Sequence, residues 1–86
     1  MENTIIIYGT TWCPDCVRAK NVFSKKGIEY TWINISDDME ARAYVEKVNQ
    51  GSRSVPTIIF EDGDILVEPS NAELKNKLEQ LISLSK

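Results

Sequence analysis

The chain has 86 residues, of which 10 are basic and 13 acidic, so that its formal net charge is −3. This length predicts one domain, over residues 1–86, with a small hydrophobic core. The acidic balance argues against nucleic-acid binding. The absence of histidine removes the commonest metal ligand, and no metal site is expected.

The first part of the chain predicts a β-α-β unit. Ile5–Tyr8 is a short, continuous, β-branched run, as expected for a strand at the centre of a sheet. A helix follows from Pro14 to Gly27, because proline suits a first helical turn and glycine a C-cap. Glu29–Ile35 alternates as a strand does, with Trp32 as a packing residue. Such units join parallel strands.

The rest of the chain predicts a helix, two antiparallel strands and a final helix. The second helix opens at Ser36–Asp38, with Asp37 and Glu40 as a capping box. A strand, a turn and a second strand follow over Val55–Phe60, Glu61–Asp64 and Ile65–Val67. The last helix begins with Ser70 as its N-cap and Glu73 as the capping partner.

Apolar residues at helical spacing predict the face that each helix buries. They are Ala19, Val22 and Phe23 in the first helix, Ala41, Tyr44, Val45 and Val48 in the second, and Leu74, Leu78, Leu81 and Ile82 in the third.

No apolar run is long enough for a membrane span or for the core of a signal peptide, and residues 1–4 carry no basic side chain. We therefore expect a cytoplasmic protein that does not bind membranes. A polar chain of this size gives no reason to expect more than a monomer.

The two cysteines lie in the motif Cys13-Pro14-Asp15-Cys16, across the predicted start of the first helix. Thiols at i and i+3 there can close a short disulfide, and the helix N-terminus stabilises the thiolate of the first. A bridge closing so small a loop would stabilise the fold little, so a redox function explains the pair better. Cys13 is expected to be the nucleophile, and Cys16 the less exposed and less acidic thiol that resolves the disulfide.

The element order and two motifs make the chain resemble the glutaredoxins of the thioredoxin-like superfamily. These motifs are Trp12-Cys13-Pro14-Asp15-Cys16 and Ser54-Val55-Pro56-Thr57. Within the family the chain is most similar to the mycoredoxin branch, over residues 8–13, 48–57, 61–63 and 69–70. The resemblance implies an α/β fold of order β-α-β-α-β-β-α, in which a four-stranded mixed sheet is flanked by three helices.

The resemblance also implies a binding site for a small thiol. Pro56 would be cis, which exposes the backbone of Val55 to the cysteinyl backbone of the bound thiol. The carboxylate of a bound tripeptide would lie at the N-terminus of the last helix, where this chain has Ser70 and Asn71.

Two residues beside the nucleophile complete the expected site. Trp12 would shield Cys13 and offer the substrate an apolar surface. Pro14 would fix the turn between the two thiols.

Several positions depart from the usual pattern of the family. Asp15 replaces an aromatic residue, and its carboxylate disfavours the thiolate of Cys13. Thr10 replaces a lysine, and Glu68 lies where a glycine pair is usual and could repel an anionic thiol. Arg53 is a candidate for the missing positive charge, although a solvated linker arginine is the alternative reading.

These observations favour a thiol-disulfide oxidoreductase that reduces mixed disulfides between proteins and a small thiol: glutathione, mycothiol or bacillithiol. No tightly bound cofactor is expected. The alternative is a dithiol donor recharged by a flavoprotein of the thioredoxin-reductase type, and loss of Cys16 separates the two, since only the dithiol mechanism requires it. An iron-sulfur carrier using Cys13 of two subunits is disfavoured by Trp12 and Pro14, and a zinc-bridged dimer lacks further ligands.

Overall fold

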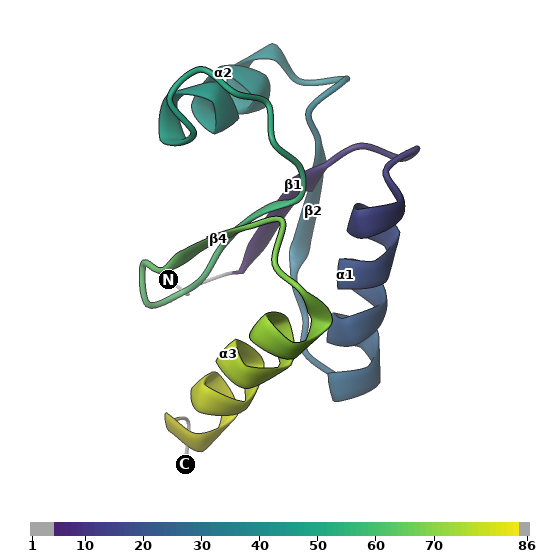
Figure 1. Ribbon diagram of the computed structural model, residues 1–86, viewed down its shortest axis with the longest axis vertical. Helices are drawn as coiled ribbons and strands as arrows, with labels where there is room; N and C mark the ends of the chain where they lie inside the picture. Colours follow the sequence, from purple (N-terminus) through teal and green to yellow (C-terminus); the bar gives the residue numbers. More distant parts are fainter. Residues whose placement is uncertain (1–4, 85–86) are drawn as a thin grey trace.

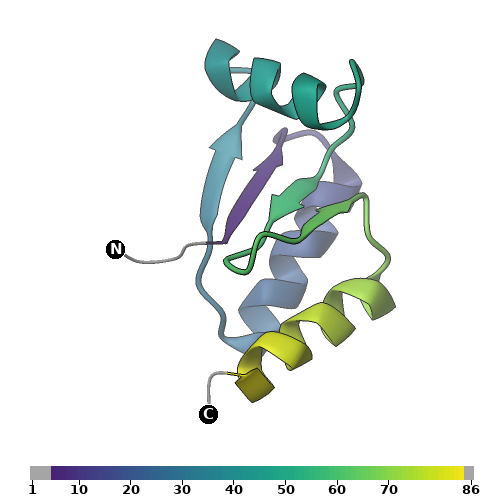
Figure 2. The same ribbon diagram turned by 90° about the vertical axis from the view of Figure 1, so that its left-hand side faces the viewer.

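The computed structural model describes residues 5–84, which form a four-stranded sheet with helices on both faces (Figure 1, Figure 2). Residues 1–4, for which the sequence predicts no signal peptide, and residues 85–86 lie outside the described range. The elements, in chain order, are β1 (Ile6–Gly9), α1 (Pro14–Lys26), β2 (Thr31–Asn34), α2 (Met39–Val48), β3 (Thr57–Ile59), β4 (Ile65–Val67) and α3 (Asn71–Leu84). This order is the predicted one.

The sheet is mixed and has the strand order β2-β1-β3-β4, which confirms β1 as a central strand. β1 runs parallel to β2 and antiparallel to β3, and β3 and β4 are antiparallel. β2 and β3 are shorter than the predicted Glu29–Ile35 and Val55–Phe60. The two strands are shorter because each extends only as far as its pairing with β1. β1 pairs with β2 over four residues, and the pairing of β1 with β3 ends at Tyr8 and Thr57.

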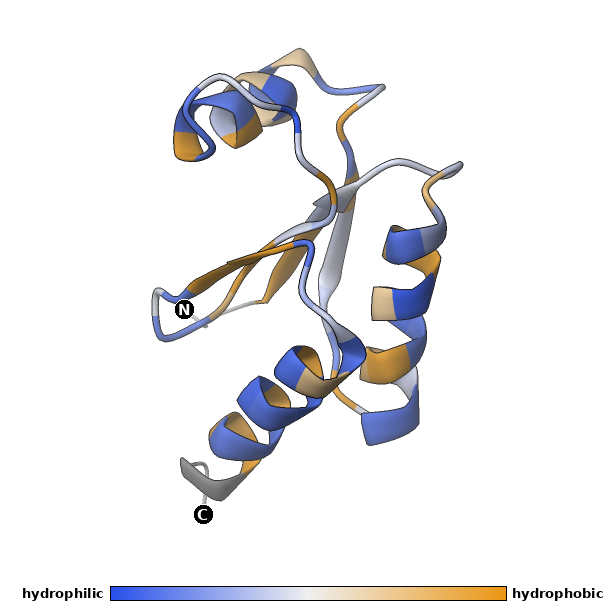
Figure 3. Ribbon diagram, in the orientation of Figure 1, coloured by the Kyte–Doolittle hydropathy of each residue, from blue (hydrophilic) through white to orange (hydrophobic). Residues whose placement is uncertain are grey.

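The two faces of the sheet carry separate apolar clusters. α1 and α3 lie side by side on one face, where Phe23, Leu74 and Leu78 pack on Ile7 and Ile58. On the other face, α2 covers a smaller cluster of Tyr8, Ile35, Ala41 and Val45. Figure 3 shows hydrophobic residues along β4 and a mixture of hydrophobic and hydrophilic residues along the helices. Among residues 5–84, no helix has the length and apolar composition needed to cross a membrane.

Three details of the predicted helices are wrong. Asp38, not Asp37, is the N-cap of α2, since its side chain accepts a hydrogen bond from the Ala41 N–H at 3.0 Å. Tyr44 is exposed, because it lies at the edge of the buried face of α2, with its ring 5.5 Å from that of Tyr8. Ile82 is also exposed.

Ile82 lies at the edge of the apolar face of α3. Leu74, Leu78 and Leu81 are spaced by four and three residues, which places them on one face of α3. Leu74 and Leu78 are buried and Leu81 is half-buried against the same cluster. Ile82 follows Leu78 by four residues and lies at the edge of this face farthest from Leu81, where it is 39% exposed.

Ion pairs of Lys77 with Asp62 and Asp64 connect α3 to the turn between β3 and β4. Lys77 is 8% exposed, and its Nζ lies 2.5 Å from an Asp62 carboxylate oxygen and 2.6 Å from an Asp64 one. The same ammonium lies 5.5 Å from the centre of the Phe60 ring. The hydrogen bond from Lys77 lowers the pKa of Asp62, and the two carboxylates raise the pKa of Lys77.

These shifts predict how stability varies with pH. A carboxylate with a lowered folded pKa stabilises the fold above its unfolded pKa, and this contribution is lost as the pH falls through the folded value. The contribution of Lys77 is complete below its unfolded pKa and is lost as the pH rises through the raised folded value. We therefore expect stability to be flat between about pH 5 and pH 9 and to fall on both sides.

The variant Lys77→Met tests this account, because methionine keeps the apolar stem and removes the charge. Its urea midpoint should be lower than that of the wild type at pH 7, and the loss between pH 5 and 3 should be smaller. Lys47→Met, at an exposed position of α2, is the control. Equal acid sensitivity of the wild type and Lys77→Met would contradict the assignment.

Candidate active site

Cys13 lies at the N-cap of α1, directly after the loop that leaves β1. Its backbone is extended, and its Sγ accepts a hydrogen bond from the Cys16 N–H at 3.2 Å. Pro14 occupies the first helical position, as predicted. The N–H that proline lacks would have no partner within the helix at this position, so the helix loses no hydrogen bond. The side chain of Cys13 is half-buried. A thiolate at this position receives both an N–H hydrogen bond and the favourable end of the helix dipole.

Cys16 lies one turn inside α1 and is fully buried, at 0% exposure. Burial is the main cause that raises the pKa of its thiol to about 12, and the hydrogen bond with Cys13 and the nearby charge of Asp15 act in the same direction. The structure therefore confirms that Cys16 is the less exposed of the two thiols. The two cysteines are in the free, reduced form.

Asp15 pairs with a cation on the surface of α1. One of its carboxylate oxygens lies 3.2 Å from the Arg18 guanidinium, and the two side chains are each about half-exposed. Arg18 also donates a hydrogen bond to the Pro69 carbonyl at 3.4 Å, which connects α1 to the segment before α3. The carboxylate of Asp15 is thus partly neutralised by Arg18.

The loop before β3 faces Cys13. Its Val55–Pro56 peptide is cis, as the resemblance implies. The Cys13 thiol donates a long hydrogen bond, 3.9 Å, to the Val55 carbonyl. Thr57 fixes the loop, because its hydroxyl donates to the Ser54 carbonyl at 2.7 Å and accepts from the Asn49 side chain at 3.1 Å.

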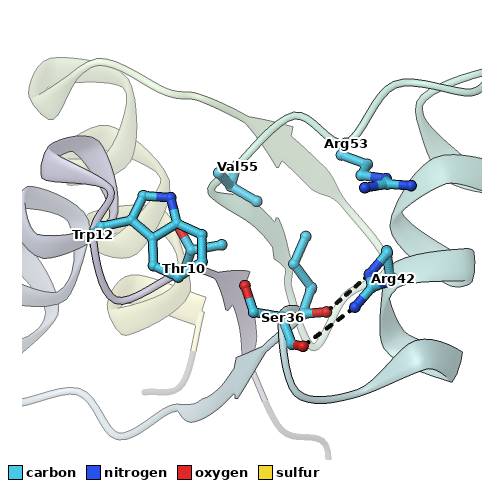
Figure 4. Close-up of a pocket in the computed structure, with 7 residues that line it drawn as sticks. Thr10, Trp12, Ser36, Arg42, Arg53 and Val55 are labelled. Carbon is cyan, nitrogen blue, oxygen red and sulfur yellow. Dashed lines mark hydrogen bonds between the residues drawn. The ribbon is translucent and has the colours of Figure 1, made fainter.

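A hollow of about 400 Å³ opens between this loop, the loop after β1 and the start of α2 (Figure 4). Its lining residues are Thr10, Trp12, Ile35, Ser36, Arg42, Arg53 and Val55. Trp12 is 72% exposed, whereas Thr10 is 7% exposed, and the Thr10 hydroxyl has no hydrogen-bond partner among the described residues. The hollow therefore combines an aromatic side, formed by Trp12, with polar groups opposite.

Two arginines form the side of the hollow nearest α2 (Figure 4). Arg42 donates to the backbone carbonyls of Ile35 and Ser36, each at 3.2 Å, and these bonds hold its guanidinium in place. Arg53 is paired with Glu46 of α2. The expected role of Arg53 as a positive group near the site is therefore compatible with its position, although Glu46 offsets part of its charge.

Sequence reasoning missed Ile35, Ser36 and Arg42 as residues beside the site. A signal existed for Arg42, which lies four residues after the N-cap Asp38. A cation close to a helix N-terminus opposes the helix dipole, so its presence there indicates a role other than helix stability.

The N-terminus of α3, where the resemblance places the carboxylate of a bound thiol, carries the predicted capping box. Ser70 and Glu73 cap it reciprocally: the Glu73 N–H donates to the Ser70 hydroxyl at 3.1 Å, and the Ser70 N–H donates to the Glu73 carboxylate at 2.9 Å. Glu68, two residues earlier, is exposed, has a φ of 50° and donates its N–H to the Pro56 carbonyl at 2.8 Å. Neither Ser70 nor Asn71 lines the hollow.

Solved structures place this fold among the thioredoxin-like proteins. The chain superposes on the thioredoxin-like protein BC3987 with a TM-score of 0.70 and 27% identity, covering 91% of this chain and 99% of the other. It superposes on the glutaredoxin of Archaeoglobus fulgidus with a TM-score of 0.67 and 27% identity, covering 93% and 86% of the two chains.

Sequence comparison gives the family within this class. Residues 5–66 match the model of the glutaredoxin family. The chain is 38% identical to Mycoredoxin 1 of Corynebacterium glutamicum over 79 residues, which cover 92% of this chain and 98% of the relative. The chain belongs to the glutaredoxin family and is a thiol-disulfide oxidoreductase, which confirms the resemblance and its mycoredoxin branch.

Proposed function

We propose that the chain reduces mixed disulfides between proteins and a low-molecular-weight thiol, with Cys13 as the nucleophile. The observation that carries the proposal is the position of a half-buried thiol at a helix N-cap beside a polar hollow. Trp12 and Val55 connect the thiol to the hollow, since both line it. Trp12 precedes Cys13 in the chain, and the Val55 carbonyl accepts the hydrogen bond of the Cys13 thiol. Cys16, buried below, is the proposed resolving thiol.

The proposed reaction has two exchange steps. The Cys13 thiolate attacks the small-thiol sulfur of the mixed disulfide, the S–S bond breaks, and the protein thiolate leaves and takes a proton from water. Cys13 now carries the small thiol in a disulfide. The thiolate of a second small-thiol molecule attacks the small-thiol sulfur of this disulfide, so that the disulfide of two small thiols leaves and the Cys13 thiolate is restored.

In this proposal the body of the small thiol lies in the hollow. The backbone of Val55 pairs with the cysteinyl part of the ligand, and Trp12 packs on its apolar atoms. Thr10, Arg42 and Arg53 then face its polar groups, and the two arginines favour an anionic group on the side near α2. At the N-terminus of α3, the exposed carboxylate of Glu68 and the Ser70–Glu73 capping box disfavour the binding of a second carboxylate of the small thiol.

The test of the proposal is the variant Cys16→Ser, assayed with peptide mixed disulfides of glutathione, bacillithiol and mycothiol, each with its own free thiol as reductant. Serine is nearly isosteric at this buried position, so the fold should persist. We expect turnover within about threefold of the wild type with at least one thiol, because the monothiol route does not use Cys16. That thiol is the one the hollow selects.

A different outcome would favour the alternative function. If turnover fails with all three thiols, while the wild type reduces insulin with a thioredoxin reductase, the chain is a dithiol donor recharged by a flavoprotein. The proposal takes the partners to be a small thiol and disulfide-bearing proteins, and the working form to be a cytoplasmic monomer.

A further inference from the structure

The buried thiol of Cys16 and the ring of Trp32 both lie close to Gly9. A Cβ placed on Gly9 would lie 2.5 Å from the Cys16 Sγ and 2.8 Å from the Trp32 Cη2. Both atoms are thus next to one point above the Gly9 backbone, and the sulfur and the edge of the indole are neighbours. Glycine at position 9 is what leaves room for both.

The Trp32 ring is fixed from two sides. Trp32 is in β2, opposite Ile7 of β1, and packs against the apolar cluster below α1 and α3. Lys20 lies one helical turn after Cys16 in α1, and its Nζ is 4.0 Å from the centre of the Trp32 ring. This distance is typical of a cation–π contact, which favours a single ring position.

We propose that Trp32 is a positioning residue that covers the Cys16 sulfur and thereby slows its attack on disulfides of Cys13. In this proposal the indole edge and the Gly9 backbone exclude water from the sulfur. Hydration stabilises a thiolate, so the exclusion of water disfavours deprotonation of Cys16. The observed burial and the raised pKa of Cys16 agree with this arrangement. The inference rests on the proposed role of Cys16 as resolving thiol.

The step that Trp32 would slow is a single exchange. Cys16 loses its proton to solvent, and its thiolate attacks the Cys13 sulfur of the mixed disulfide. The Cys13–Cys16 disulfide forms, the bond from Cys13 to the small thiol breaks, and the small thiol leaves as a thiolate that is then protonated. When this step is slow, an external thiol reaches the mixed disulfide first, and the chain follows the monothiol route.

The first measurement concerns Cys16 alone, in the Cys13→Ser background, where its thiolate absorbance is followed against pH. Adding Trp32→Leu should move the midpoint down by at least about one pH unit, since the sulfur gains solvent. Trp32→Phe, which keeps an aromatic ring in the core, should give a smaller shift in the same direction. Tyr30→Leu is the matched control, because Tyr30 packs on Phe23 in the same apolar cluster.

The second measurement follows the step itself with an aromatic disulfide, 5,5′-dithiobis(2-nitrobenzoate). Attack by Cys13 releases the first coloured thiolate, and attack by Cys16 on the resulting mixed disulfide releases the second. Each pH unit lost from the Cys16 midpoint raises its thiolate fraction about tenfold and lowers its nucleophilicity about threefold, so the second phase should accelerate about threefold. The first phase should stay within about twofold of the wild type, since Trp32 acts on the other sulfur.

These results separate the inference from the proposed function. An unchanged Cys16 midpoint in both folded Trp32 variants, or equal changes in the two phases, would overturn the inference. The same would follow if Tyr30→Leu shifted the midpoint as far as Trp32→Leu. Neither measurement uses a physiological thiol, so failure of the mixed-disulfide assay would reject the proposed function and leave the titration of Cys16 as a valid test.

Discussion

Replacing Cys13 with serine will abolish thiol-disulfide exchange while leaving the fold intact. The sequence contains two cysteines, and the other, Cys16, is fully buried with a pKa raised to about 12. It is therefore almost entirely protonated at pH 7 and out of reach of a protein disulfide. We expect the rate of mixed-disulfide reduction to fall by at least about a thousandfold, to the uncatalysed level.

The fold of Cys13→Ser should be preserved because the side chain at position 13 has a second role. The Cys13 sulfur accepts the Cys16 N–H as the N-cap of α1, and a serine hydroxyl is a better N-cap acceptor than a thiol. The urea midpoint should equal or exceed that of the reduced wild type. Loss of exchange in a variant that is also unfolded would be uninformative, so both measurements are made on one preparation. Residual exchange above about one per cent of the wild-type rate would mean that Cys16 can act as a nucleophile.

Adding a single methyl group at Gly9 will lower the free energy of unfolding more than most substitutions of surface residues do. The Cβ of Gly9→Ala would lie 2.5 Å from the Cys16 Sγ and 2.8 Å from the Trp32 Cη2, well inside van der Waals contact. The sulfur belongs to the first turn of α1, and the ring is held by the core and by Lys20, so neither can move freely. Overpacking of this kind costs about 1–3 kcal/mol, and Gly9→Val should reach the upper end or prevent folding.

A double-mutant cycle identifies the source of this cost. Trp32→Leu removes the ring that the added Cβ would approach. In its presence, the effect of Gly9→Ala on the free energy of unfolding should shrink by about 1 kcal/mol. The contact with Cys16 remains. Urea unfolding of the four proteins gives the coupling energy directly. If Gly9→Ala alone changes the free energy of unfolding by less than about 0.5 kcal/mol, the close approach is not a real constraint.

Features governed by neighbouring residues could be predicted from the sequence. The N-cap position of Cys13, the proline after it and the Ser70–Glu73 capping box depend on hydrogen bonds within one helical turn, which is why the motifs indicate them directly. The order of elements followed from periodicity. The shift of the α2 cap from Asp37 to Asp38 shows the limit of such signals, since either aspartate fits the local pattern.

Features that depend on distant parts of the chain could not be predicted in this way. Trp32 packs against the apolar cluster as expected, but its closeness to Gly9 depends on the pairing of β2 with β1. Arg42 reaches the hollow only because α2 crosses the end of β2, where two carbonyls hold its guanidinium. The positions of Ser70 and Asn71 outside the hollow equally reflect tertiary packing.

The pairing of β1 with β3 also determines when, during synthesis of the chain, the site can come into existence. Cys13 and the Val55 carbonyl that faces it are 42 residues apart, and the pairing of β1 with β3, which ends at Tyr8 and Thr57, brings them together. A growing chain is made from its N-terminus, so the dithiol leaves the ribosome well before the loop that completes the hollow beside it. Until β3 has emerged, a nascent chain can hold both thiols and still lack the hollow in which we propose that a small thiol binds.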